Sequence, residues 1–135
     1  MNDIIAELKA ALVAAGLRVY DTAVPSGMAV QYPYVLLWSS AGRMTSVSVC
    51  DSRSVLDDTV GVTAVGILAD QVRSTARKAR TALDGLEPGV IAGRHVDEVR
   101  LFDSRPIAVD RDFPLVGGSY PMTGVDIYRV SSTPA

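Results

Sequence analysis

The side chains that could support acid–base or covalent chemistry are few and scattered along this chain. His95 is the single histidine and Cys50 the single cysteine, and neither has a second ligand at the spacing of a zinc site. No GxSxG string marks a nucleophilic serine. Counting alone leaves a Ser–His–Asp arrangement open, because serines and aspartates are plentiful. We interpret His95 as a surface or strand-edge residue and expect no enzyme activity, metal or cofactor.

Two further patterns suggest ligand binding but lack the residues that would support it. The Gly-Gly-Ser string at 117–119 could cradle a phosphate, yet no lysine and no helix follow it, so it is predicted to be a loop tip. Asp110 and Asp112 flank Arg111, which would partly neutralise them and weakens a metal interpretation. The aspartate pair at 57–58 is typical of a solvated turn.

The most distinctive charge pattern in the sequence is a group of arginines on a helix expected over residues 68–85. Arg73, Arg77 and Arg80 fall within about 60° of arc beside its apolar stripe. A solvated face is one interpretation, with i,i+4 partners such as Asp84 for Arg80. A subunit interface is another, because arginines that border a core stripe suit carboxylates on a second chain. A DNA-binding face would require a wider basic patch with interleaved aromatic residues, which the sequence lacks.

Two helices and several strands must position these residues. The first helix is expected over 3–15, with an apolar stripe of Ile4, Ile5, Leu8, Ala11, Leu12 and Ala15. Its opposite face carries Ala6, Ala10, Val13 and Ala14 and is nearly uncharged, which suits either simple helix propensity or contact with a neighbouring subunit. The second helix buries Ala69, Val72, Ala76, Ala79 and Leu83.

Strands are predicted at 17–20, 33–38, 44–50, 59–67, 96–102 and 124–130, the one at 44–50 from a weak pattern. Residues 104–123 hold three prolines and two adjacent glycines and are expected to form a long functional loop. The order helix, strand, strand, weak strand, strand, helix, strand, strand predicts an α+β fold. Its mostly antiparallel or mixed sheet would carry both helices on one face. We expect a single domain over 1–131 and a disordered tail over 132–135.

Composition narrows the possible partners. The formal net charge of -2 offers no global attraction to nucleic acid or anionic lipid. No stretch approaches the ~20 apolar residues of a membrane span, and the N-terminus lacks the basic start of a signal peptide. Folding in a reducing cytoplasm follows from these features. The apolar content of 48% is modestly high, which suggests that another chain covers part of the surface.

The arrangement resembles the tail terminator (tail completion) proteins of long, non-contractile-tailed bacteriophages. The likeness spans about residues 3–131. It rests on an N-terminal helix followed by VYDTAVPSGMAVQYPYVLL, in which a strand, a Pro/Gly loop and a "PYV" strand follow in order. It also rests on the strand-to-helix step TVGVTAVGILADQVRSTARKARTALDG, and on VDRDFPLVGGSYPMTGVDIYRV, a loop before a strand that ends in a Tyr-Arg pair.

This resemblance implies a structural virion subunit of the tail or neck, made in the host cytoplasm. Such subunits form a ring, usually a hexamer, that caps the tail tube and ends its polymerisation. The ring then presents a surface to head-completion or connector proteins, and the phage DNA passes through its lumen without sequence-specific binding. Another neck protein, such as a head-closure or head–tail connector protein, is the alternative, and a small ligand-binding domain is a further one.

A ring requires surfaces through which copies associate. The candidates are the alanine face of the first helix, at Ala6 and Ala10, and the arginine edge of the second, at Arg73, Arg77 and Arg80. The long loop is a third candidate, at Asp110, Arg111, Asp112, Phe113 and Leu115, for contact with the tail tube or a neighbouring copy. Reversing all three helix charges is expected to abolish the ring while the monomer stays folded.

Overall fold

The computed structural model describes residues 2–25, 27, 29–40, 43–45, 55–112, 115 and 118–134. The elements are α1 (Asn2–Ala14), β1 (Val19–Asp21), β2 (Tyr34–Ser39), β3 (Arg43–Thr45), β4 (Val55–Gly66), α2 (Ala69–Leu83), β5 (Gly89–Ile91), β6 (Arg94–Val96), β7 (Arg100–Ser104), β8 (Ala108–Val109) and β9 (Met122–Pro134). The predicted α+β order is confirmed, with short additional strands after α2. No helix in the described ranges is long and apolar enough to cross a membrane.

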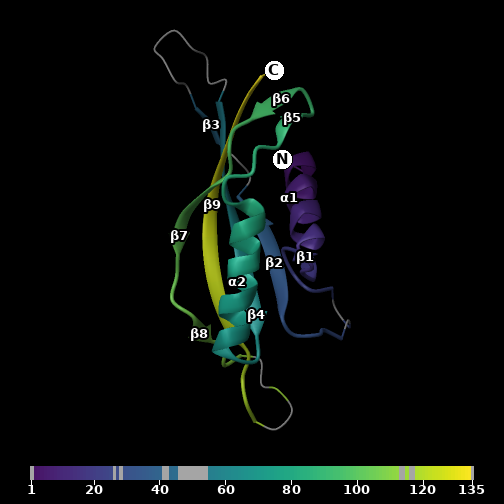
Figure 1. The fold of residues 1–135 in the computed structure, drawn as a ribbon, viewed down its shortest axis with the longest axis vertical. Helices are drawn as coiled ribbons and strands as arrows, with labels where there is room; N and C mark the ends of the chain where they lie inside the picture. The colour runs from purple at the N-terminus through teal and green to yellow at the C-terminus, as the bar shows by residue number, and fades with distance from the viewer. Residues whose placement is uncertain are drawn as a thin grey trace.

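One mixed sheet forms a single layer, and both helices cover the same face of it (Figure 1). The strand order is β1-β2-β4-β9-β6-β5, with β3 beside β4 and with β7 and β8 beside β9. The pairing of β1 with β2 is parallel, and the other described pairings are antiparallel. The 13-residue strand β9 therefore pairs with four strands: β4 on one side and β6, β7 and β8 in succession on the other.

The core lies between the sheet and the two helices. Alternate residues of the central strands point into it because successive side chains of a strand face opposite ways. Its buried members are Ile4, Ile5, Leu8, Leu12, Val35, Leu37, Val60, Val62, Ala79, Leu83, Val96, Val99, Tyr128 and Val130. The predicted stripe of α1 is confirmed except at its end, since Ala15 is exposed.

Local backbone chemistry ends α1 where the sequence places a glycine. Gly16 has a φ of +86° and donates its N–H to the Val13 carbonyl at 2.9 Å. Leu17 donates to the Leu12 carbonyl at 3.3 Å and packs against the core. This pair of bonds is the Schellman ending of a helix, in which a left-handed glycine satisfies carbonyls that the helix leaves open.

Glycines also allow α2 to lie close to the sheet. A Cβ on Gly124 of β9 would sit 2.9 Å from Cγ1 of Val72, and one on Gly66 would sit 2.9 Å from Cβ of Gln71. On the sheet face away from the helices, the ring of Trp38 lies directly over Gly61, its cross-strand partner. The Trp38 indole Nε1–H donates to the Thr63 hydroxyl at 3.0 Å.

Three sequence predictions differ from the structure after α2. The strand expected over 96–102 is interrupted, because β6 ends at Val96 and β7 begins at Arg100. Between them Val99 is fully buried and donates to the Leu86 carbonyl at 2.8 Å, which turns the chain inward. The loop expected over 104–123 is shortened by β8, which pairs with the start of β9.

The expected disordered tail is the third difference. Residues 132–134 continue β9, and the side chain of Ser132 is buried. The guanidinium of Arg94 donates to the Ser132 hydroxyl at 2.9 Å and to its carbonyl at 2.8 Å. Pairing with β6 therefore orders a segment whose small polar residues resemble a tail when read alone.

The hydroxyl of Tyr128 is buried without a hydrogen-bond partner among the described residues. Because an unpaired buried hydroxyl costs free energy, Tyr128→Phe is expected to raise the free energy of unfolding by about 1 kcal/mol. Burial also raises the pKa of Tyr128 above its ordinary value of 10.0. Above about pH 10 the unfolded chain therefore releases a proton that the folded chain keeps, and stability falls by up to about 1.4 kcal/mol per pH unit.

Urea unfolding at pH 7 and between pH 9 and 11 measures both effects. Tyr128→Phe should remove part of the alkaline loss of stability, and Tyr20→Phe, at a tyrosine that is only half-buried, is the matched control. A Tyr128→Phe protein that is less stable than wild type by more than about 1 kcal/mol would mean that the hydroxyl has a partner after all.

Candidate subunit interface

Arg80 of α2 is clamped to the sheet of its own chain. Its guanidinium donates from Nε to Oδ2 of Asp126 at 2.7 Å and from Nη2 to Oδ1 at 2.9 Å. Nη2 also donates to the Ser104 hydroxyl of β7 at 2.7 Å. A two-pronged arginine–carboxylate pair is among the stronger polar contacts in proteins. One side chain thus joins α2, β7 and β9.

This clamp changes the interpretation of Arg80. The Asp126 side chain is 5% exposed, so its carboxylate needs Arg80 as a counterion. The Arg80 side chain itself is 42% exposed. The hydrogen bond to Asp126 raises the pKa of Arg80, against the opposing effect of burial. The suggested partner Asp84 instead accepts the Leu101 N–H at 2.9 Å. Charge reversal at Arg80 is therefore expected to damage the monomer, and the triple reversal proposed from sequence no longer isolates an interface.

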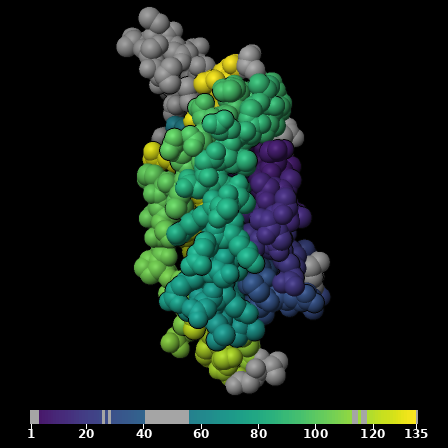
Figure 2. All heavy atoms as spheres, in the orientation of Figure 1, coloured from purple at the N-terminus to yellow at the C-terminus, as the bar shows by residue number. Residues whose placement is uncertain are grey.

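A groove runs beside α2, between that helix and the chain that links β7 to β8. It has a volume of about 570 Å³ and is lined by Val72, Arg73, Ala76, Arg77, Arg80, Ser104, Arg105, Pro106, Ile107, Gly124 and Asp126. We call it the arginine groove. Figure 2 shows the hollow between the teal atoms of α2 and the green atoms of β7. Its floor is apolar, and four arginines against one carboxylate give its lining a net charge of three positive units.

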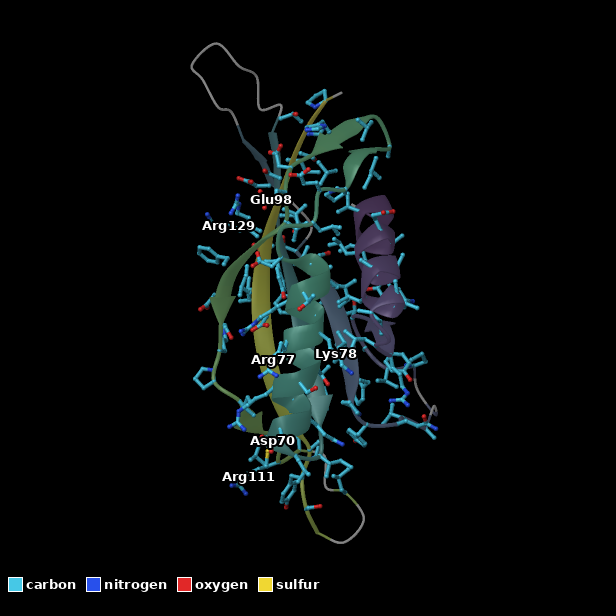
Figure 3. All side chains as sticks on the ribbon, in the orientation of Figure 1. Asp70, Arg77, Lys78, Glu98, Arg111 and Arg129 are labelled. Carbon is cyan, nitrogen blue, oxygen red and sulfur yellow. The ribbon has the colours of Figure 1, made fainter. Side chains whose placement is uncertain are left out.

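The arginines of this groove are neutralised to different extents. Arg73 contacts Asp70 at 2.8 Å, but both side chains are largely exposed, and such pairs contribute little. Arg105 approaches Asp103 only to 4.0 Å. The side chain of Arg77 makes no ion pair or hydrogen bond within the described part of the chain, and it is exposed on the groove side of α2 (Figure 3). Arg77 is therefore the residue here most available to an outside carboxylate.

The alanine face of α1 lies apart from this groove. Ala6 and Ala10 are exposed, and Val13 on the same side is 54% exposed. Figure 1 places α1 along one side of α2 and strands β7 and β8 along the other. Ala6, Ala10 and Val13 are thus exposed on a face of α1 that lies apart from the arginines of α2.

The segment that carries Asp110, Arg111 and Asp112 is a tight turn. The Asp112 N–H donates to Oδ1 of Asp110 at 3.1 Å, and the Asp110 N–H donates to the Pro121 carbonyl at 2.8 Å. Arg111 does not pair with its flanking aspartates but lies 5.9 Å from the centre of the Tyr120 ring.

The rest of this candidate loop is partly described. Leu115 is half-buried and donates its N–H to the Ser119 carbonyl at 2.7 Å. The candidate Phe113 lies outside the described residues, as does Cys50.

A second charged surface, not anticipated from the sequence, surrounds the β5–β6 hairpin. A hollow of about 360 Å³ there is lined by Glu87, Gly89, His95, Val96, Asp97 and Glu98. We call this hairpin with its flanking carboxylates the acidic hairpin. Val90 pairs across the hairpin with His95 and is 64% exposed. The turn has positive φ at Ala92 (51°) and Gly93 (76°), a signature of the tight turns that suit two-residue hairpins. In the sequence, the apolar residues at 90–91 followed by Ala-Gly were the pattern that could have predicted this hairpin.

No catalytic arrangement emerges from the described residues. His95 is exposed on β6, and no group of three or more histidine, cysteine or carboxylate residues within the described ranges could hold a metal ion. The features that stand out are two surfaces of opposite charge.

The comparisons with known proteins concern the fold. No protein-family model matches the chain, and no curated protein sequence matches it. Among solved structures, it is similar to a chain of one described as "Virion of native gene transfer agent (GTA) particle". The TM-score is 0.62 over 97% of this chain and 92% of that one. The two sequences are 15% identical, so the likeness shows a shared fold.

Proposed function

We propose that this protein is a structural subunit of a phage-like virion, and that it caps a tail tube by forming a ring of its own copies. The observation that carries the proposal is the shared fold along 97% of the chain with a component of a gene transfer agent virion. The likeness also covers 92% of the other chain.

The surface chemistry supports a role in assembly over a role in catalysis. The arginine groove and the acidic hairpin both present charged side chains that are only partly paired beside apolar side chains, a combination suited to protein interfaces. In this proposal the subunit is not an enzyme and has no cofactor. Its partners are its own copies, most simply six of them, the tail-tube protein and a head-completion or connector protein. Viral DNA passes through the ring without sequence-specific binding.

The test is assembly with the tube. We expect native mass measurement of the purified protein, alone and mixed with the tail-tube protein of the same particle, to give a ring of defined copy number. Electron microscopy should place that ring at one end of each tube, and tubes assembled with it should stop growing. Recovery with filled heads in place of tubes would favour a head-closure or connector role. A monomer under all these conditions would refute the proposal.

A further inference from the structure

We infer that neighbouring copies associate head to tail, with the acidic hairpin of one copy seated in the arginine groove of the next. The inference deepens the proposed function, on which it rests, because it names the surfaces that build the ring. It is carried by the charge and shape of two surfaces that lie far apart on one molecule.

The groove offers a cationic rim over an apolar floor. Val72, Ala76 and Ile107 contribute to that floor. Arg77 is free within the described residues, and Arg73 and Arg105 are held only by exposed or distant aspartates. Its most favourable occupant therefore brings carboxylates to the rim and an apolar side chain to the floor.

The hairpin offers that combination. Three carboxylates line its hollow, those of Glu87, Asp97 and Glu98. Glu98 is held by Arg100 at 2.7 Å, whereas no ion pair within the described residues holds Glu87 or Asp97. These two carboxylates are opposite in charge to the arginines of the groove. Val90, on β5 of the same hairpin, is 64% exposed, and the hairpin stands at one end of the molecule (Figure 1). Burying an exposed valine on an apolar floor favours association.

The positions of the two surfaces determine the kind of assembly. The hairpin follows the C-terminal end of α2, whereas the groove lies along the side of that helix, from Val72 to Arg80. When a hairpin of one copy occupies a groove of another, one hairpin and one groove remain free. Contacts of this heterologous type generate rings when the rotation closes and filaments when it does not.

A duplex nucleic acid suits the groove less well. A DNA-binding surface requires a row of unopposed cations across a broad face. Here Asp70 and Asp103 lie beside the arginines at the rim of the groove, and Asp126 lines its interior.

Paired charge reversals test the contact. Arg77→Glu in the groove and Glu87→Arg beside the hairpin are each expected to weaken self-association about ten-fold or more, as measured by sedimentation or native mass, with the tail-tube protein added if rings require it. The double variant should regain most of the loss, because each pair of surfaces again carries opposite charges. Lys78→Glu is the matched control: it makes the same charge change on the opposite side of α2 (Figure 3) and should leave association unchanged. Thermal unfolding checks that every variant is folded.

The outcomes separate this inference from the function. Rings that form normally with Arg77→Glu, an equal effect of Lys78→Glu, or no recovery in the double variant would overturn the contact and leave the ring proposal standing. Weaker binding of Arg77→Glu to a 20-base-pair duplex with unchanged self-association would overturn it in favour of nucleic acid. Wild-type protein that stays monomeric even with tube protein would overturn both.

Discussion

Arg80→Ala is expected to lower the free energy of unfolding by about 2–4 kcal/mol, because it leaves the carboxylate of Asp126 buried without its cation. Asp126 is 5% exposed, and both of its oxygens accept hydrogen bonds from Arg80. The lower part of the range applies if water reaches the vacated site, since the Arg80 side chain is 42% exposed. The substitution also removes the link to Ser104 and should loosen β7 first.

Urea unfolding measures this loss, and Arg77→Ala is the matched control, one helical turn away on the same edge of α2. The control should change stability by less than about 0.5 kcal/mol. The double variant Arg80→Met with Asp126→Leu removes both charges and is expected to recover most of the stability, since two apolar side chains of similar volume need no partner. Equal, small effects of Arg80→Ala and Arg77→Ala would show that the clamp contributes nothing.

Gly61→Ala is expected to lower stability by about 2–3 kcal/mol, because the added methyl group would overlap the ring of Trp38. The ring is held in place by its hydrogen bond to Thr63 and by pairing of β2 with β4. Relief therefore requires Trp38 to leave its position, which breaks that bond and exposes the indole.

Fluorescence reports the displacement directly, because Trp38 is the only tryptophan. We expect a shift of emission to longer wavelength in Gly61→Ala under native conditions, together with a lower urea midpoint. In a Trp38→Ala background the same glycine substitution should cost little. If it costs as much there, the cause lies in the backbone of β4 and the steric explanation is wrong.

The predictable part of the fold is the part encoded by local pattern. The stripe of Ile4, Leu8 and Leu12 has helical spacing, and Gly16 closes the helix by its own backbone preference. The apolar run at β2 and the alternation in β4 likewise identify strands from neighbouring residues alone. These signals gave the element order and the α+β class, which the structure confirms.

The features that sequence reasoning missed depend on contacts between distant segments. Arg80 and Asp126 are 46 positions apart, so they pair only because α2 packs against β9 in the folded chain. A lone aspartate within the apolar string of β9 was the signal that could have revealed a buried partner. The order in residues 132–134 and the break at Val99 also arise from tertiary contacts, since their local composition resembles a tail and a continuous strand.

The structure shows where the candidate interface residues lie, while their role in an interface stays a prediction. The arginine edge of α2 is solvent-accessible at Arg73 and Arg77, as helical spacing predicted, but Arg80 serves its own chain. The groove forms because the chain that links β7 to β8 lies next to α2. No local pattern in the sequence predicts that contact. Whether copies meet at Ala6, Ala10 or the turn at Asp110–Asp112 stays a prediction.

The place of β9 in the sheet has a consequence for biosynthesis. This strand pairs with β4, β6, β7 and β8, yet the ribosome delivers it after every other element of the fold. Until then β4 has an open edge and the Arg80 guanidinium has no counterion. Folding must therefore wait for long-range pairing, which is intrinsically slow. Nascent chains remain exposed to premature aggregation or proteolysis during that interval.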